Sequence, residues 1–151
     1  MVESNLQELT SRLQSEKDWH QSAIFTEKGE ILANIKAVLK PDEIQFYIKA
    51  YDDRDTTVGE GFYINDVHFD VHRFHPPLIY GRRGGPDDGE GIALCRVKPR
   101  TQVGDERYWY LLITYLLPIL SAKAVPQMVK FSETYRKNNN LYHYILVGNP
   151  E

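Results

Sequence analysis

The 151-residue chain has the length of one globular domain, and its composition, 42% apolar and 26% charged, excludes a disordered or collagen-like protein. The formal net charge of −3 gives no electrostatic reason to expect a nucleic-acid partner, and the single cysteine, Cys95, excludes an internal disulfide or a cluster of several metal-binding thiolates. The polar N-terminus and the shortness of every apolar run predict an intracellular protein without a membrane span.

The N-terminal part of the sequence predicts a helix followed by a hairpin. Leu6, Leu9 and Leu13 recur at spacings of three and four between polar residues, which is typical of a helix with one buried face. Two short apolar segments, 22–26 and 31–35, then flank a turn that contains glycine. This pattern indicates two antiparallel strands.

A second helix is predicted to begin at Pro41. Proline suits the first helical position because its φ is fixed near the helical value and its missing N–H leaves no donor unpaired. We expect this helix to be closed by the charged run 52–55. Three strand-like segments separated by turns follow at 61–64, 67–74 and 77–80.

The C-terminal half predicts a loop, two strands and a helix. Residues 81–91 hold five glycines and one proline and are expected to form a surface loop. The segments 92–98 and 108–117 are rich in β-branched and aromatic residues, and the second is expected in the centre of the sheet. A helix over 121–137 and a short apolar tail at 141–147 complete the chain. Helices at both ends of a run of hairpins indicate an α+β fold.

The sequence holds no strong signal for catalysis or metal binding. His68, Asp70 and His72 alternate along a predicted strand and share one face, but two-residue spacing does not guarantee a third ligand, so a solvated strand face is favoured. No nucleophile is accompanied by a recognisable base, and Cys95 falls inside a predicted strand, where a buried core residue is favoured. We therefore expect no catalytic residue, no metal and no cofactor.

Positive charge gathers in the middle of this acidic chain. A local basic face would attract an acidic protein or anionic lipid headgroups, whereas scattered surface arginines would have no such role. The residues concerned are Arg73, Arg82, Arg83, Arg96, Lys98 and Arg100.

The order of these elements and several local strings resemble the profilin family of actin-monomer-binding proteins. The string LKPDEI at 39–44 is similar to the opening of the family's second helix, and 22–33 is similar to its first hairpin. The strings GFYI at 61–64 and GRRG at 81–84 follow in the family's order. Each string is weak alone, but the order and spacing together are specific.

The resemblance implies an α+β fold with a central antiparallel sheet, the N- and C-terminal helices packed on one face and smaller helices on the other. It spans nearly the whole chain, so we expect one domain over 1–151, in which 141–151 form a C-terminal extension. It also implies a non-catalytic, cytoplasmic protein that binds monomeric actin and regulates actin polymerisation in the cytoskeleton. The actin-binding residues carried over by position are His68, Arg73, Tyr80, Arg82, Arg83, Lys123, Gln127 and Lys130.

The family's second site, an aromatic groove for poly-proline, is degenerate in this sequence. Leu6, Leu9 and Leu32 stand at three ring positions of the family. A different groove could be built from Tyr135 together with Trp19, Tyr142 and Tyr144, but core packing is favoured for most of these aromatics. Leucine offers neither a flat face for proline rings nor a donor for their carbonyl groups, so we predict weak or absent poly-proline binding. The missing aromatics and long loops are similar to the divergent profilins of Asgard archaea.

Two other functions stay open at this stage. The basic loop at Arg82 and Arg83 would also suit the phosphoinositide headgroups of a membrane surface. A small α+β domain would also suit a scaffold of the longin or roadblock type, which would dimerise by extending its sheet. We expect a monomer, so a stable dimer would favour the scaffold.

Overall fold

The computed structural model describes residues 2–97 and 108–137. The predicted tail at 141–147 and the basic residues Lys98 and Arg100 lie outside this part of the chain. The described elements are α1 (Val2–Gln14), β1 (Gln21–Thr26), β2 (Ile31–Ile35), α2 (Pro41–Lys49), the 3₁₀ turn η1 (Ala50–Asp52), α3 (Arg54–Glu60), β3 (Phe62–Ile64), β4 (Val67–His75), β5 (Leu78–Arg83), β6 (Glu90–Val97), β7 (Trp109–Leu116) and α4 (Ser121–Lys137).

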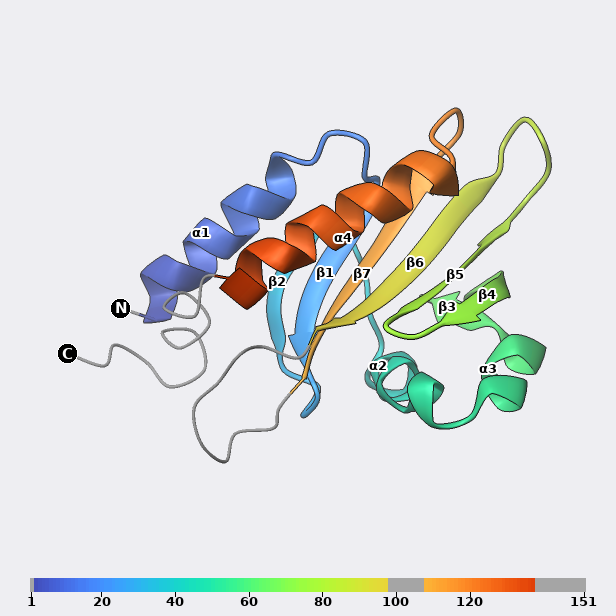
Figure 1. Ribbon diagram of the computed structural model, residues 1–151, viewed down its shortest axis with the longest axis horizontal. Coiled ribbons are helices and arrows are strands. Elements are labelled where there is room, and N and C mark those ends of the chain that lie inside the picture. Colours follow the sequence, from blue (N-terminus) through green and yellow to red (C-terminus); the bar gives the residue numbers. More distant parts are fainter. Residues whose placement is uncertain (1, 98–107, 138–151) are drawn as a thin grey trace.

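The strands form one seven-stranded antiparallel sheet in the order β2-β1-β7-β6-β5-β4-β3 (Figure 1). β7 lies inside the sheet between β1 and β6, as its apolar sequence predicts. Six of its eight side chains are buried in one or the other of two hydrophobic cores, which lie on opposite faces of the sheet and are described below. Because β7 pairs with β1, the strand that leads into the C-terminal helix is joined directly to the N-terminal hairpin.

α1 and α4 pack on one face of the sheet (Figure 1). Leu9 and Leu13 of α1 and Met128 of α4 are almost fully buried there, since the apolar stripe of each helix faces the strands. This arrangement confirms the expected packing of the terminal helices. We call this cluster the first core; its buried residues are Leu9, Leu13, Trp19, Ile24, Ala33, Ala93, Cys95, Val97, Trp109, Leu111, Ile113, Tyr115, Ala124, Met128 and Phe131.

The shorter helices cover the opposite face, which confirms the second half of the expected layer order. Ile44 and Tyr47 of α2 are buried there, and burial raises the pKa of the Tyr47 hydroxyl well above its usual range. We call this cluster the second core; its buried residues are Phe25, Ile44, Tyr47, Ala50, Phe62, Ile64, Phe69, Val71, Ile79, Ile92, Leu94, Tyr110 and Leu112.

Helix α3 is an element that the sequence analysis missed. The charged run 52–55 was expected to close the second helix, but it also begins α3, because the Asp53 carboxylate caps the helix by accepting from the Thr56 N–H at 3.2 Å. The helix ends before Gly61, whose φ of +76° suits glycine. A charged run that contains aspartate can therefore end one helix and also begin the next.

The predicted glycine-rich loop is shorter than expected, because β5 extends to Arg83 and β6 begins at Glu90. Two of its glycines lie within these strands and are needed for close packing. A Cβ at Gly81 would lie 1.8 Å from the Asp70 carbonyl oxygen, and one at Gly91 would lie 2.1 Å from the Tyr115 ring. Glycine in this segment therefore marks close approach within the sheet as well as a loop.

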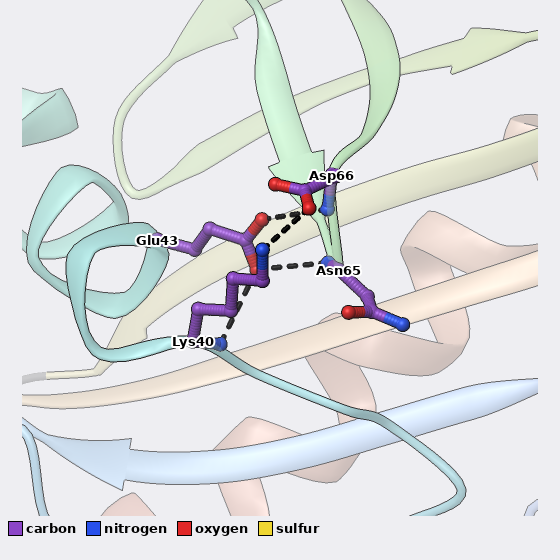
Figure 2. A network of polar contacts seen from close by, with 4 residues as sticks. All are labelled: Lys40, Glu43, Asn65 and Asp66. Carbon is purple, nitrogen blue, oxygen red and sulfur yellow. Dashed lines mark hydrogen bonds and ion pairs between the residues drawn. The ribbon is translucent and has the colours of Figure 1, made fainter.

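A buried carboxylate ties α2 to the turn between β3 and β4 (Figure 2). Glu43 accepts from the backbone N–H groups of Asn65 at 2.8 Å and of Asp66 at 2.9 Å, and also from that of Lys40 at 3.3 Å. Lys40 forms an ion pair with Asp66 across the same junction. Asn65 and Asp66 both have positive φ, so the turn that they form presents its N–H groups to one anion.

Candidate functional site

The two neighbouring arginines of β5 lie on opposite faces of the sheet, because successive strand residues alternate. Arg82 follows Tyr80 by two residues, and Tyr80 packs against the first core. Arg83 lies over the ring of Phe69, a residue of the second core, with 5.6 Å between its guanidinium carbon and the ring centroid. The structure therefore does not bring Arg83 together with Arg82 on one surface.

Arg83 is held inside the fold by a buried carboxylate. Its Nε and Nη2 donate to Oε1 of Glu90 at 3.2 and 3.0 Å, and Gln21 donates to Oε2 of the same carboxylate at 3.2 Å. Only 5% of the Glu90 side chain is exposed, so this charge needs its partners. No pattern within one strand signals this pairing, since the contact joins β1, β5 and β6.

Four other candidates share the face of the sheet that carries α1 and α4, on the outer strands. Arg73 and Tyr80 are cross-strand partners of β4 and β5, so their side chains lie on the same face. His68 alternates with Phe69, which points into the second core, and so lies on this face as well. A bulge in β4 brings Arg73 into this register. We call His68, Arg73, Tyr80 and Arg82 the outer-strand surface.

Two of the four residues of the outer-strand surface are arginines. Arg73 is exposed and Arg82 is half-buried, and within residues 2–97 and 108–137 neither has an ion-pair partner. Figure 1 shows α1 and α4 over the part of the sheet formed by β2, β1, β7 and β6, with β5, β4 and β3 extending beyond them. These guanidinium groups are therefore positioned to meet an external anion.

His68 is engaged in local contacts. Its Nε2 donates to the Glu60 carbonyl oxygen at 2.9 Å, its ring packs against Tyr63 with centroids 4.9 Å apart, and its Nδ1 lies 3.9 Å from Asp70. Across the described part of the chain, no group of three or more His, Cys, Asp or Glu side chains is arranged to hold a metal ion. His68 therefore links α3 to β4 at the rim of the outer-strand surface.

Two of the α4 candidates contact the connection between α1 and β1. Gln127 accepts from the Trp19 indole N–H at 3.3 Å and donates to Asp18 at 2.9 Å, and Lys123 pairs with Asp18 at 3.1 Å. The hydrogen bonds from Gln127 and then Lys123 lower the pKa of Asp18. Lys123 and Gln127 thus lie on the side of α4 that faces away from the outer-strand surface.

The third α4 candidate, Lys130, lines a hollow of about 380 Å³ between α1 and α4. Apart from Phe131, the residues around this hollow are polar, and they include Arg12 and Glu16. Burial raises the pKa of Glu16, and the Lys130 charge opposes that shift. Such a lining offers hydrogen bonds and charges together with apolar surface to a ligand.

The leucines of the degenerate groove belong to the first core. Leu9 is fully buried, while Leu6 and Leu32 are half-buried and pack against that core. The side chain of Tyr135 lies outside the described residues. Both tryptophans, Trp19 and Trp109, are buried in the first core as well, so neither presents an exposed ring to a ligand.

The side of α4 nearest the outer strands carries residues that the sequence analysis did not select. Ser121 is 2.7 Å from the Tyr115 hydroxyl, and the Tyr115 ring lies against Gly91 of β6. Val125, one helical turn after Ser121, is half-buried against the first core. Relative to the buried residue Ala124, the helical period places Ser121 and Val125 on one flank of α4 and Lys123 and Gln127 on the other. This period could have distinguished the two flanks from the sequence alone.

Within the described residues, no helix combines the length and hydrophobicity needed to cross a membrane.

Comparison with curated proteins gives no match. Comparison with solved structures gives profilin IA of Acanthamoeba castellanii, with a TM-score of 0.69, 19% identity and coverage of 83% of this chain and 91% of that one. Profilin of Schizosaccharomyces pombe is similar, with a TM-score of 0.65, 20% identity and coverage of 80% and 87%.

A third similar structure is LokiProfilin1 in its complex with rabbit actin, with a TM-score of 0.62, 11% identity and coverage of 89% of this chain and 93% of that one. At these identities the structural likenesses establish the fold. The sequence itself matches the Profilin family model over residues 4–101, well over half of the chain. The chain therefore belongs to the profilin family.

Proposed function

We propose that this protein is a non-catalytic regulator of the actin cytoskeleton that binds monomeric actin through the outer-strand surface. The observation that carries the proposal is the pair of arginines, Arg73 and Arg82, that flank Tyr80 on an open sheet face and form no ion pair with any described residue. Arginines in such a setting suit an acidic protein surface, and the aromatic ring adds apolar contact. LokiProfilin1, which shares the fold, was crystallised with rabbit actin.

We leave Arg83, Lys123, Gln127 and Lys130 out of the proposed contact. Arg83 is paired with a buried carboxylate on the other face, and Lys123 and Gln127 hold the segment that leads into β1. Lys130 lies on the same side of α4 as these two. The proposed surface is therefore narrower than the set that the family resemblance implies.

The test is the spontaneous polymerisation of pyrene-labelled muscle actin with increasing amounts of the protein. We expect slower nucleation, and about tenfold weaker binding to actin monomers for the variant that combines Arg73→Glu and Arg82→Glu, because both charges would then repel an acidic surface. Lys130→Glu is the matched control and should leave binding unchanged. Equal actin binding by the folded double variant and the native protein would refute the proposed surface.

We also propose that poly-proline binding is weak or absent, because leucines replace the rings of the groove and pack into the first core. Calorimetry with a poly-proline peptide is the suitable measurement, since both tryptophans are buried and their fluorescence is poorly placed to report a surface ligand. Heat of binding comparable to that of a profilin with an aromatic groove would contradict this proposal.

A second candidate function, binding to phosphoinositide membranes, is favoured by the same two arginines, Arg73 and Arg82. Sedimentation with liposomes that contain phosphatidylinositol bisphosphate, compared with neutral liposomes, tests it. Binding that needs the anionic lipid and is lost in salt would support this function, while equal sedimentation with both liposomes would exclude it.

A further inference from the structure

A second hollow lies on the opposite face of the sheet, where the linker from β2 to α2 meets the β3–β4 turn. Its volume is about 370 Å³, near the lower end of the range for ligand pockets of roughly 300–1,000 Å³. We call it the Lys36 hollow; the lining residues used below are Lys36, Val38, Val67, Phe69, Arg83 and Glu90.

The floor and part of the rim of the Lys36 hollow are apolar. Ile64 and Phe69 are buried in its floor and belong to the second core. Val38 is 58% exposed and Val67 is 44% exposed, and these are two of the six large apolar side chains that are exposed in the described part of the chain. Exposed apolar groups that gather around a hollow are typical of an interaction site.

The polar part of the hollow offers cationic donors without a free carboxylate. Both oxygens of Glu90 are used internally, by Arg83 and by Gln21. Arg83 keeps Nη1 free of these bonds, and 39% of its side chain is exposed. Lys36 is exposed at the rim and, within the described residues, has no ion-pair partner. The hollow is therefore complementary to an anionic group attached to an apolar one.

The walls of the hollow are fixed by contacts that exist without a ligand. Asn65 is part of the lining, and its N–H is held by the buried Glu43 carboxylate, as Figure 2 shows. On the other wall, the Asn34 side chain bonds to both backbone groups of Ala37, at 2.8 and 2.9 Å, and so fixes the linker that carries Lys36 and Val38. A preformed site binds with less loss of conformational entropy.

We propose that the Lys36 hollow binds an acidic, apolar peptide segment of a partner protein. A leucine or phenylalanine of the segment packs between the exposed side chains of Val38 and Val67, and a neighbouring carboxylate pairs with Lys36 and with Nη1 of Arg83. Apolar rims on both sides of the hollow favour an extended segment over a compact small molecule. The site lies on the face opposite the outer-strand surface, so this partner and actin bind at the same time.

The test uses the full chain and two arrays of short blocked peptides. In one array, leucine or phenylalanine is placed among glutamates, and in the other lysine replaces each glutamate. We expect binding to the acidic array only, with chemical-shift changes at the amides of Val38 and Val67. Lys36→Glu should weaken this binding by about fivefold or more, whereas Lys49→Glu, at an exposed lysine outside the hollow, should not.

Each other outcome overturns the proposal. Absence of binding to the acidic array, equal binding to both arrays, or equal effects of Lys36→Glu and Lys49→Glu would each show that the hollow is not a site for acidic peptides. Addition of actin monomers to the bound peptide separates this proposal from the proposed function. If actin displaces the peptide and the variant that combines Arg73→Glu and Arg82→Glu still loses actin binding, the peptide does not bind at the hollow, and the inference fails while the actin proposal stands.

Discussion

Arg82 and Arg83 are adjacent in the sequence and differ in almost every structural respect. Arg82 lies on the face of α1 and α4 and has no ion-pair partner within the described residues, while Arg83 lies on the face of α2 and is bonded to the buried Glu90. The same contrast holds for the two faces. The Glu43 carboxylate on the α2 face is bonded within the fold, whereas the Arg73 and Arg82 guanidinium groups of the outer-strand surface form no ion pair within the described residues.

The contrast shows how a stability role and a binding role are separated over a very short stretch of chain. Strand alternation alone sends one arginine to each face, so a single dipeptide supplies a structural ion pair and a surface charge. Substitutions at Arg82 and Arg83 should therefore affect different measurements, and each prediction below tests one side of that separation.

The largest effect is expected from Arg83→Met. This change leaves the Glu90 carboxylate buried with only Gln21 as a partner, and should lower the free energy of unfolding by about 3 kcal/mol in urea denaturation. Arg82→Met makes the same chemical change on the other face and should alter stability by less than about 0.5 kcal/mol.

Adding Glu90→Leu to Arg83→Met removes the unpaired charge and should recover most of the lost stability. Equal losses for Arg82→Met and Arg83→Met would contradict the separation of roles between the two arginines.

A smaller loss is expected from Glu43→Ala, because three backbone N–H groups lose their shared acceptor and the β3–β4 turn loses its link to α2. The free energy of unfolding should fall by about 2 kcal/mol. Gln45→Ala, at an exposed position of the same helix, is the control and should have little effect. If both variants are equally stable, the network of Figure 2 does not hold the turn.

The smallest effect is expected from Thr114→Val, and it has the opposite sign. Thr114 is fully buried in β7, and within the described residues its hydroxyl has no hydrogen-bond partner, in contrast to Glu43 and Glu90. Valine has nearly the same shape, so the variant should be more stable by about 1 kcal/mol, measured as a higher urea midpoint. A loss of stability would show that the hydroxyl is satisfied in solution.

Much of the fold could be predicted because its signals are local. The stripe of Leu9 and Leu13, the hairpin, the start of α2 at Pro41 and the span of α4 each depend on residues close in sequence. Helix α3 was missed because a charged run was interpreted only as a stop, although Asp53 within it is a strong N-cap.

The surface could be predicted only in part, because its composition depends on long-range contacts. The resemblance to the family suggests Arg83 and Gln127 as actin-binding residues as readily as Arg82. Only the folded chain shows that Arg83 is already bonded to Glu90, and Gln127 to Asp18. Alternation along β5 would have placed Arg82 and Arg83 on opposite faces of the sheet, but it could not have predicted which residues each one contacts. The Lys36 hollow has no sequence signal, since it joins a linker, a turn and residues of five strands.

Hydrogen exchange of the native protein, with and without actin monomers, tests the central claim most directly. Proposed binding at the outer-strand surface predicts that actin slows exchange in β4 and β5 around Arg73, Tyr80 and Arg82, and leaves the rim of the Lys36 hollow at Val38 and Val67 unchanged. Protection at Val38 and Val67 without protection in β5 would place actin on the opposite face and contradict the account.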